Sequence, residues 1–174
     1  MRRVILKPHP ETPARAVSAV EAEVHAPSAG QVRLRFEVRG ALESLQIPAP
    51  ADPERTDELW KHTCFEVFAR VAGAEGYDEF NFSPSTQWAV YRFDGYRAGM
   101  MKPEVLAPRV EGGIEGDAYV LHAAFDLPGM GPWRVGLAAV MEEAEGTKSY
   151  WALTHPPGKP DFHHADAFVF ELRP

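Results

Sequence analysis

The sequence has a single cysteine, no long apolar run and no excess of positive charge, and each absence excludes a class of protein. One cysteine, Cys64, excludes an internal disulfide framework. No segment approaches the ~20 apolar residues that a membrane helix needs, so we expect no membrane association. The net charge of −7 gives no sign of the basic face typical of nucleic-acid-binding domains, so we expect no nucleic-acid partner.

The N-terminus lacks the pattern of a secretory leader. Arg2 and Arg3 precede only three apolar residues, Val4–Leu6, whereas a signal peptide needs ~7–15. We therefore predict a cytoplasmic protein. The 174 residues suit one domain, and we expect a single domain over residues 1–174. The sequence carries no signal for an oligomeric state.

Aromatic residues and prolines are abundant, with 10 Phe, 5 Tyr, 4 Trp and 16 Pro, which favours strands joined by irregular loops. Gln31–Arg39 alternates strictly between apolar and polar side chains, as expected of an antiparallel strand with one solvated face. One short helix is expected at 55–62. Similar alternation predicts further strands at 20–25, 63–71, 78–82, 88–93, 118–127, 133–141, 149–154 and 167–172. This pattern predicts an all-β fold, a β-sandwich.

Several enzyme motifs are absent: there is no P-loop, no dinucleotide-binding glycine motif, no nucleophile elbow and no H-E-x-x-H zinc motif. Cys64 lies in the middle of a predicted strand with no local group to lower its pKa. We interpret Cys64 as a buried structural residue in preference to a nucleophile.

The segment 58–68 places Trp60 before a strand and puts His62, Cys64 and Glu66 on one face of it. Thiol, imidazole and carboxylate groups need no explanation on a solvated face. On a concave face they line a polar pocket, and we favour that interpretation for His62, Cys64 and Glu66 as a set, with Trp60 as a rim or core aromatic beside them.

A second polar segment, 77–101, places Asn81 and Ser83 close to Trp88 in the chain. Neutral amides and hydroxyls beside flat rings are what a sugar site needs, because pyranose C–H faces stack on rings while hydroxyls need polar partners. The alternative is that Ser83 belongs to a turn and the aromatic residues fill the core.

A third segment, 150–166, holds three of the seven histidines within ten residues. We expect this proline-framed loop to shape a binding site, because rigid loops lose less entropy when a ligand binds. Asp161, His163 and His164 also have the atom types of a divalent-metal site, although adjacent histidines on an extended chain point to opposite sides. The candidate ligand-binding residues of this segment are Trp151, His155, Lys159, Asp161, His163 and His164.

Several phrases of the sequence resemble a known family. They are T-C-F-E-V-F, F-N-F-S-P, W-A-V-Y-R-F-D-G-Y-R and H-P-P-G-K-P-D-F-H-H-A-D. Together they resemble the small bacterial DOMON-like proteins, relatives of the family 9 carbohydrate-binding modules. The resemblance covers most of the chain. It implies an immunoglobulin-like antiparallel β-sandwich of about nine to eleven strands, with a pocket on one sheet for a saccharide or haem.

The same resemblance implies roles for individual residues. Trp60 corresponds to a tryptophan that clamps the sugar, and Trp151 is a looser match to the second clamp. Glu66 corresponds to the acid of the family's strand, and Asn81 to the polar residue before its Ser-Pro turn. The family's acidic pair before the strand is here Lys61-His62, so a site built on that pair is not expected.

Three functions follow from these observations. The first is binding of a carbohydrate or another small glycan-like molecule, with no cofactor and no catalysis. The second is non-covalent haem binding for electron transfer, with axial ligands drawn from Met and His or Lys; the candidates are Met100, Met101, Lys102, His155 and His163. The third is an enzyme, which requires acid and base groups to converge within hydrogen-bond reach; its candidates are His62, Glu66, His155, Asp161 and His163.

Overall fold

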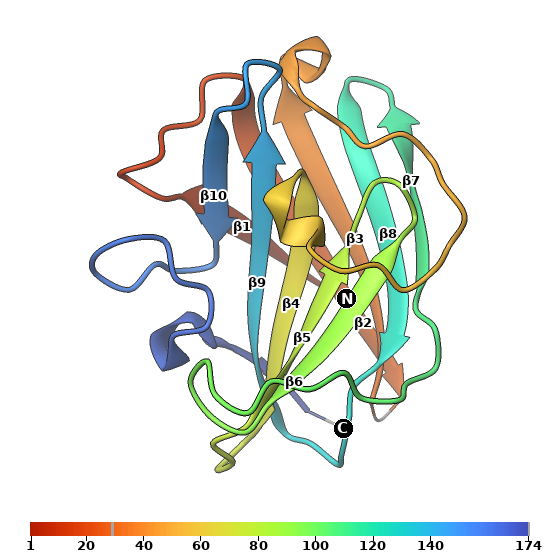
Figure 1. Cartoon of the computed structure of the whole chain (residues 1–174), viewed down its shortest axis with the longest axis vertical. Helices are drawn as coiled ribbons and strands as arrows, with labels where there is room; N and C mark the ends of the chain where they lie inside the picture. The colour runs from red at the N-terminus through yellow and green to blue at the C-terminus, as the bar shows by residue number, and fades with distance from the viewer. Residues whose placement is uncertain (29, 174) are drawn as a thin grey trace.

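A computed structural model describes residues 1–28 and 30–173. The described residues form eleven strands and three short 3-10 helices (Figure 1). The strands are β1 (Arg2–Pro8), β2 (Val17–Ser28), β3 (Gln31–Gly40), β4 (Cys64–Val71), β5 (Tyr77–Phe82), β6 (Trp88–Phe93), β7 (Arg109–Glu115), β8 (Ala118–Asp126), β9 (Trp133–Glu142), β10 (Lys148–Ala152) and β11 (Phe170–Leu172). The helices are η1 (Leu42–Ser44), η2 (Leu59–Lys61) and η3 (Ala165–Ala167). No helix among these residues is long and apolar enough to cross a bilayer.

The strands pair antiparallel in the order β6-β5-β4-β9-β10-β1-β2-β3-β8-β7, and β11 also pairs with β9. The predictions of an all-β antiparallel fold and of nine to eleven strands are confirmed. The hydrogen bonds form one folded sheet, whereas a sandwich has two separate sheets. β1 joins the halves because its residues 2–6 pair with β2 and its residues 7–8 pair with β10.

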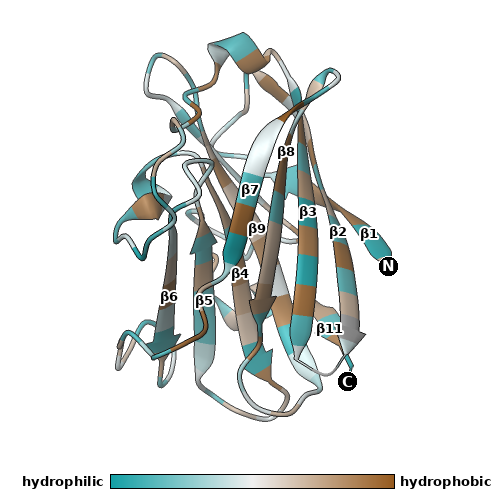
Figure 2. Cartoon of the chain, turned by 90° about the vertical axis from the view of Figure 1, so that its right-hand side faces the viewer, coloured by the Kyte–Doolittle hydropathy of each residue, from teal (hydrophilic) through white to brown (hydrophobic). Residues whose placement is uncertain are grey.

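We call the strands β1, β2, β3, β8 and β7 the β3 half, and the strands β6, β5, β4, β9, β10 and β11 the β4 half. Their inner faces pack together into the main hydrophobic core. The rings of Phe36 and Phe65, one from each half, lie 4.9 Å apart, and those of Phe80 and Phe125 lie 4.7 Å apart. Figure 2 shows polar and apolar bands alternating along β3, as the period of the sequence predicts.

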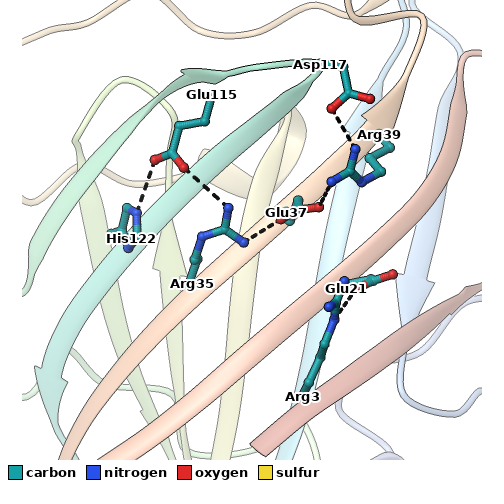
Figure 3. Close-up of polar contacts among 8 residues, drawn as sticks. All are labelled: Arg3, Glu21, Arg35, Glu37, Arg39, Glu115, Asp117 and His122. Carbon is teal, nitrogen blue, oxygen red and sulfur yellow. Dashed lines mark hydrogen bonds and ion pairs between the residues drawn. The ribbon is translucent and has the colours of Figure 1, made fainter. Parts of the chain in front are cut away.

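The outer face of the β3 half carries a network of paired charges (Figure 3). Glu37 is buried, and its two carboxylate oxygens each lie 2.5 Å from a guanidinium nitrogen, of Arg35 and of Arg39. Arg39 also contacts Asp117, and Arg35 contacts Glu115. These arginines lower the pKa of Glu37, because the carboxylate form gains both hydrogen bonds and favourable charge interactions.

Two strands and the expected helix differ from the prediction. β1 and β7 were not predicted, because Arg2–Pro8 has few apolar residues and β7 contains Gly112-Gly113 and mostly exposed side chains. The expected helix at 55–62 is the single turn η2. The residue that precedes it, Glu58, has a left-handed backbone and makes no side-chain capping bond.

Candidate functional site

The outer face of the β4 half has its own apolar cluster and a pocket beside it. Because side chains alternate between faces, Phe65 and Val67 of β4 enter the main core, while Cys64, Glu66 and Phe68 point outward. Cross-strand pairing then brings outward residues of neighbouring strands together. Outward residues of five strands form the pocket floor, namely Glu66, Glu79, Tyr91, Phe93, Val140 and Tyr150.

Two loops and η2 form the wall of the pocket. The wall residues are Trp60, Arg97, Met100, Pro160, Phe162 and His163. The loop 153–169 is anchored by Phe162 and Phe168, whose rings lie 6.3 and 6.2 Å from Phe68. Figure 1 shows η2, in yellow, in front of the strands of this half. The pocket has a volume of about 390 Å³, at the small end of the ~300–1,000 Å³ range of small-molecule sites.

Tyr77 connects the two loops beneath the wall. Its hydroxyl lies 2.7 Å from Nδ1 of His163 and accepts the backbone N–H of Arg97 at 3.2 Å. Asp161 fixes the side chain of Arg97 through an ion pair of 2.9 Å and accepts the Tyr96 hydroxyl at 2.6 Å. The cationic side chain at the pocket is therefore held by a carboxylate of the protein itself.

Glu66 is the most deeply buried charged group of the floor, with 3% of its surface exposed. Its Oε1 atom has no hydrogen-bond partner among the described residues. Burial raises the pKa of Glu66 well above the ordinary value, and the nearby charge of Glu79 raises it further. Burial in the pocket floor therefore disfavours the ionised form of Glu66.

Glu79 is the second acid of the floor. Burial raises its pKa, while a hydrogen bond from Asn81 and the charge of Arg97 act in the opposite direction. The Asn81 amide donates to Oε1 of Glu79 at 2.7 Å, and Asn81 lies opposite Glu66 in the pairing of β5 with β4. Asn81 thus positions one acid and leaves the other unpartnered.

His163 is held neutral at ordinary pH. Burial and, secondarily, the charge of Arg97 lower its pKa to about 4, against the opposing effect of Asp161. A neutral ring that accepts a hydrogen bond from the Tyr77 hydroxyl at Nδ1 carries its own proton on Nε2, which lies 3.7 Å from Oε2 of Glu79. At neutral pH His163 therefore adds no positive charge to the pocket.

The structure brings some of the predicted site residues together. Trp60, Glu66 and His163 line the pocket, and Asn81 lies next to them through Glu79. Trp60 is 39% exposed at the rim and meets Tyr91 edge-on, with ring centres 5.9 Å apart.

Three other predicted residues face the interior. Trp88 and Trp151 belong to the main core, and the indole N–H of Trp151 donates to Ser149 at 3.0 Å. Ser83 is buried in a turn, where its hydroxyl accepts from Ser85 at 2.8 Å. The physical reason is parity, since Trp151 lies one residue from Tyr150 and so points to the opposite face.

The remaining predicted residues lie around the pocket without lining it. His62 is exposed and pairs with Glu142 at 2.7 Å. His155 contacts the carbonyl of Lys7 at 2.8 Å, and Nδ1 of His164 accepts the backbone N–H of Asp166 at 3.2 Å. Asp161 acts on the pocket through Arg97, and Lys159 is exposed.

Most lining residues were not among those predicted. The new ones are Glu79, Tyr91, Phe93, Arg97, Val140, Tyr150, Pro160 and Phe162, whereas Met100 was predicted only as a candidate haem ligand. The alternation of 78–82 already placed Glu79 on the same face as Asn81, so the second acid had a signal in the sequence. The loop residues had none, because their place depends on how the loops fold over the sheet.

Within residues 1–28 and 30–173, no three His, Cys, Asp or Glu side chains gather in a way that could hold a metal ion. Asp161 is engaged by Tyr96 and Arg97, while His163 is engaged by Tyr77. In this arrangement His163 is part of the pocket wall, and Asp161 holds the wall residue Arg97.

The fold has known relatives among solved structures. A candidate carbohydrate-binding protein from Bacteroides uniformis ATCC 8492 superposes with a TM-score of 0.74 at 14% identity, over 97% of this chain and 84% of that one. A family 9 carbohydrate-binding module from Caldicellulosiruptor kristjanssonii, in complex with cellotriose, superposes with a TM-score of 0.51 at 12% identity, over 90% and 74% of the two chains. No family model and no curated protein matches the sequence. At these identities the likeness establishes a shared fold.

Proposed function

We propose that this protein binds a small saccharide in the pocket on the outer face of the β4 half. One observation carries the proposal: the pocket combines aromatic walls with buried carboxylates. Trp60, Tyr91 and Tyr150 offer rings, and Glu66 and Glu79 offer strong hydrogen-bond acceptors at the floor. The volume of about 390 Å³ suits a ligand of about one or two sugar rings.

The chemistry of sugars matches this division of the surface. A pyranose has apolar C–H faces that pack on aromatic rings, and its hydroxyls need partners once they leave water. A carboxylate accepts hydrogen bonds from hydroxyls more strongly than a neutral acceptor does. Since Oε1 of Glu66 lacks a hydrogen-bond partner among the described residues, a ligand that donates to this carboxylate offsets part of its desolvation cost.

The comparisons support the same proposal. The two similar folds come from a candidate carbohydrate-binding protein and from a module in complex with cellotriose. The shared fold also supports the distant relationship to family 9 modules that the sequence resemblance implies. We retain the DOMON-like assignment, the immunoglobulin-like description and the cytoplasmic location as parts of this proposal.

We propose binding in preference to catalysis. Of the acid–base candidates, Glu66 and His163 border the pocket, whereas His62 pairs with Glu142 and His155 contacts Lys7. A proton-transfer mechanism needs its groups within hydrogen-bond reach of one substrate.

The test is a glycan array followed by calorimetry on wild-type protein and on Trp60→Ala. We expect saccharide binding that weakens about tenfold or more in Trp60→Ala, because truncating a tryptophan that anchors a ligand costs on the order of 2 kcal/mol or more. Met130→Ala is the control, since Met130 is 89% exposed and lies outside the pocket. Absence of binding to every saccharide, or equal affinities in the two variants, would contradict the proposal.

One observation favours non-covalent haem as a second candidate ligand. Met100 and His163 both line the pocket, and methionine with histidine is a common axial pair. Haem titration of the purified protein should then produce a Soret band that Met100→Leu and His163→Ala both alter. A spectrum that stays that of free haem removes this candidate.

A further inference from the structure

Glu66 is a buried acid with an oxygen that has no hydrogen-bond partner among the described residues. A buried carboxylate normally has hydrogen-bond partners or a nearby cation, because removing an isolated charge from water is expensive. Glu66 is 3% exposed, and its Oε1 has no partner among the described residues. Because Glu66 lines the pocket, a ligand is the group that can supply the missing partner.

The surroundings of Glu66 are acidic or neutral. Glu79 is the charged group that acts on it, and Cys64 and Tyr150 are weak acids that feel its charge. His163 is neutral at ordinary pH. Within the described part of the chain, no cation contributes to the titration of Glu66.

Arg97 does not remove this imbalance. It lies at the pocket wall, but its guanidinium is paired with Asp161 at 2.9 Å. Its charge is balanced by Asp161, and the floor acids Glu66 and Glu79 keep an excess of negative charge whenever both are ionised.

The aromatic wall also favours a positive charge. Trp60 and Tyr91 meet edge-on at 77°, with ring centres 5.9 Å apart, and Tyr150 lines the other side of the floor. Ring faces attract cations by about 0.5–2 kcal/mol, most strongly where water is excluded. Aromatic rings around buried acids are a combination that recognises ammonium groups.

We propose that the saccharide bound by this pocket carries a protonated amino group, which pairs with the Glu66 carboxylate. This inference rests on the proposed function and specifies its ligand as an amino sugar. The ammonium pairs with the carboxylate of Glu66, the sugar hydroxyls bond to the remaining polar groups, and the sugar ring packs on the aromatic side chains. In the complex, the positive charge of the ammonium and the negative charge of the Glu66 carboxylate neutralise each other.

The test compares each hexosamine with its parent hexose by calorimetry at pH 7, using glucosamine, galactosamine and mannosamine. The N-acetyl derivatives keep the nitrogen but lose its charge. We expect at least one amino sugar to bind about tenfold or more tightly than both its parent hexose and its N-acetyl form, as a charge-assisted hydrogen bond provides. In Glu66→Gln this preference should fall to about unity.

The substitution has a matched control in Glu111→Gln, which removes an exposed acid on β7. It should keep the preference for the amino sugar. Thermal unfolding checks that Glu66→Gln is folded, and we expect it to be at least as stable as the wild type because glutamine cannot ionise in the buried site.

The outcomes separate this inference from the proposed function. If hexoses bind but amino sugars bind no tighter, or if the preference survives Glu66→Gln, the amino-group inference is overturned and saccharide binding stands. If no sugar of any kind binds, the proposed function fails. If cyclohexylamine binds as tightly as the best amino sugar while the parent hexose does not bind, the pocket recognises amines alone and both proposals fail.

Discussion

The two outer faces of the folded sheet differ in whether their buried acid is paired with a cation of the protein. On the β3 half, Glu37 is buried between Arg35 and Arg39, and both of its oxygens contact guanidinium groups (Figure 3). On the β4 half, Glu66 is buried more deeply, its Oε1 has no hydrogen-bond partner among the described residues, and no ion pair to it is formed there. The acid on the β3 half is therefore paired with cations of the protein, whereas the acid on the β4 half has an oxygen without a hydrogen-bond partner among the described residues.

The apolar groups differ in the same way. On the outer face of the β3 half, Ile5 alternates with the core residue Leu6, pairs with Glu21 and is 65% exposed. The β4 half instead carries a second apolar cluster around Phe68, which supports the loop that walls the pocket. A face with its own packed cluster and an acid without a partner is suited to binding a ligand. A face of paired charges is suited to exposure to solvent.

Removing the centre of the second cluster should have the largest effect. Phe68→Ala should lower the free energy of unfolding by about 3–5 kcal/mol, because a buried ring is lost and a cavity remains. It should also abolish ligand binding, since Phe162 and Phe168 lose their support. Urea unfolding measures the first effect, with Ile5→Ala as an exposed control that changes stability by less than about 0.5 kcal/mol. Equal effects of the two substitutions would show that the β4 half has no cluster of its own.

Acid should destabilise the protein through His163. The pKa of His163 is about 4 in the folded protein and 6.5 in its reference state, so the unfolded chain binds more protons as the pH falls between these values. The loss is at most about 3 kcal/mol, and it should be complete near pH 4. In His163→Gln this part of the pH dependence should disappear, as measured by urea unfolding at pH 7 and pH 4.5. If the free energy of unfolding of His163→Gln fell with pH as steeply as that of the wild type, His163 would not be a buried neutral ring.

The smallest expected effect has opposite signs on the two faces. The raised pKa of Glu66 means that its protonated form contributes stability below pH 4.5, the reference value, and that this contribution is lost as the pH rises. The lowered pKa of Glu37 means that its ionised form contributes stability above 4.5 and that this is lost in acid. At pH 8, Glu66→Gln should therefore stabilise the free protein and Glu37→Gln should destabilise it, each by about 1 kcal/mol. Shifts of the same sign would remove the contrast between the faces.

The strands and their faces were predictable because alternation is a local property of the chain. It placed Glu66 with Cys64, and Asn81 with Glu79, on one face each. The assignment of tryptophans was harder, because a polar neighbourhood in sequence does not tell which way a side chain points. Trp88 and Trp151 sit among polar residues in the sequence but enter the main core, whereas Tyr150 reaches the pocket.

The wall of the pocket could not be predicted from local patterns. Arg97 and Phe162 belong to loops with no period, and their positions follow from contacts with Phe68, Tyr77 and Asp161 that span about 20 to 90 residues of sequence. The histidine loop was recognised as part of a site, but the roles of its members depend on this docking. Only His163 among its histidines lines the pocket.

The most direct test of the account is a carboxyl-carbon NMR titration of Glu66, with and without the amino sugar that binds best. We predict that the free protein titrates Glu66 above its reference pKa of 4.5 and that the bound amino group moves this titration to lower pH, because an adjacent ammonium favours the carboxylate. The titration of Glu37 should not move. A Glu66 that titrates at or below the reference value in the free protein, or that ignores the ligand, would contradict the claim that its missing partner comes from outside the chain.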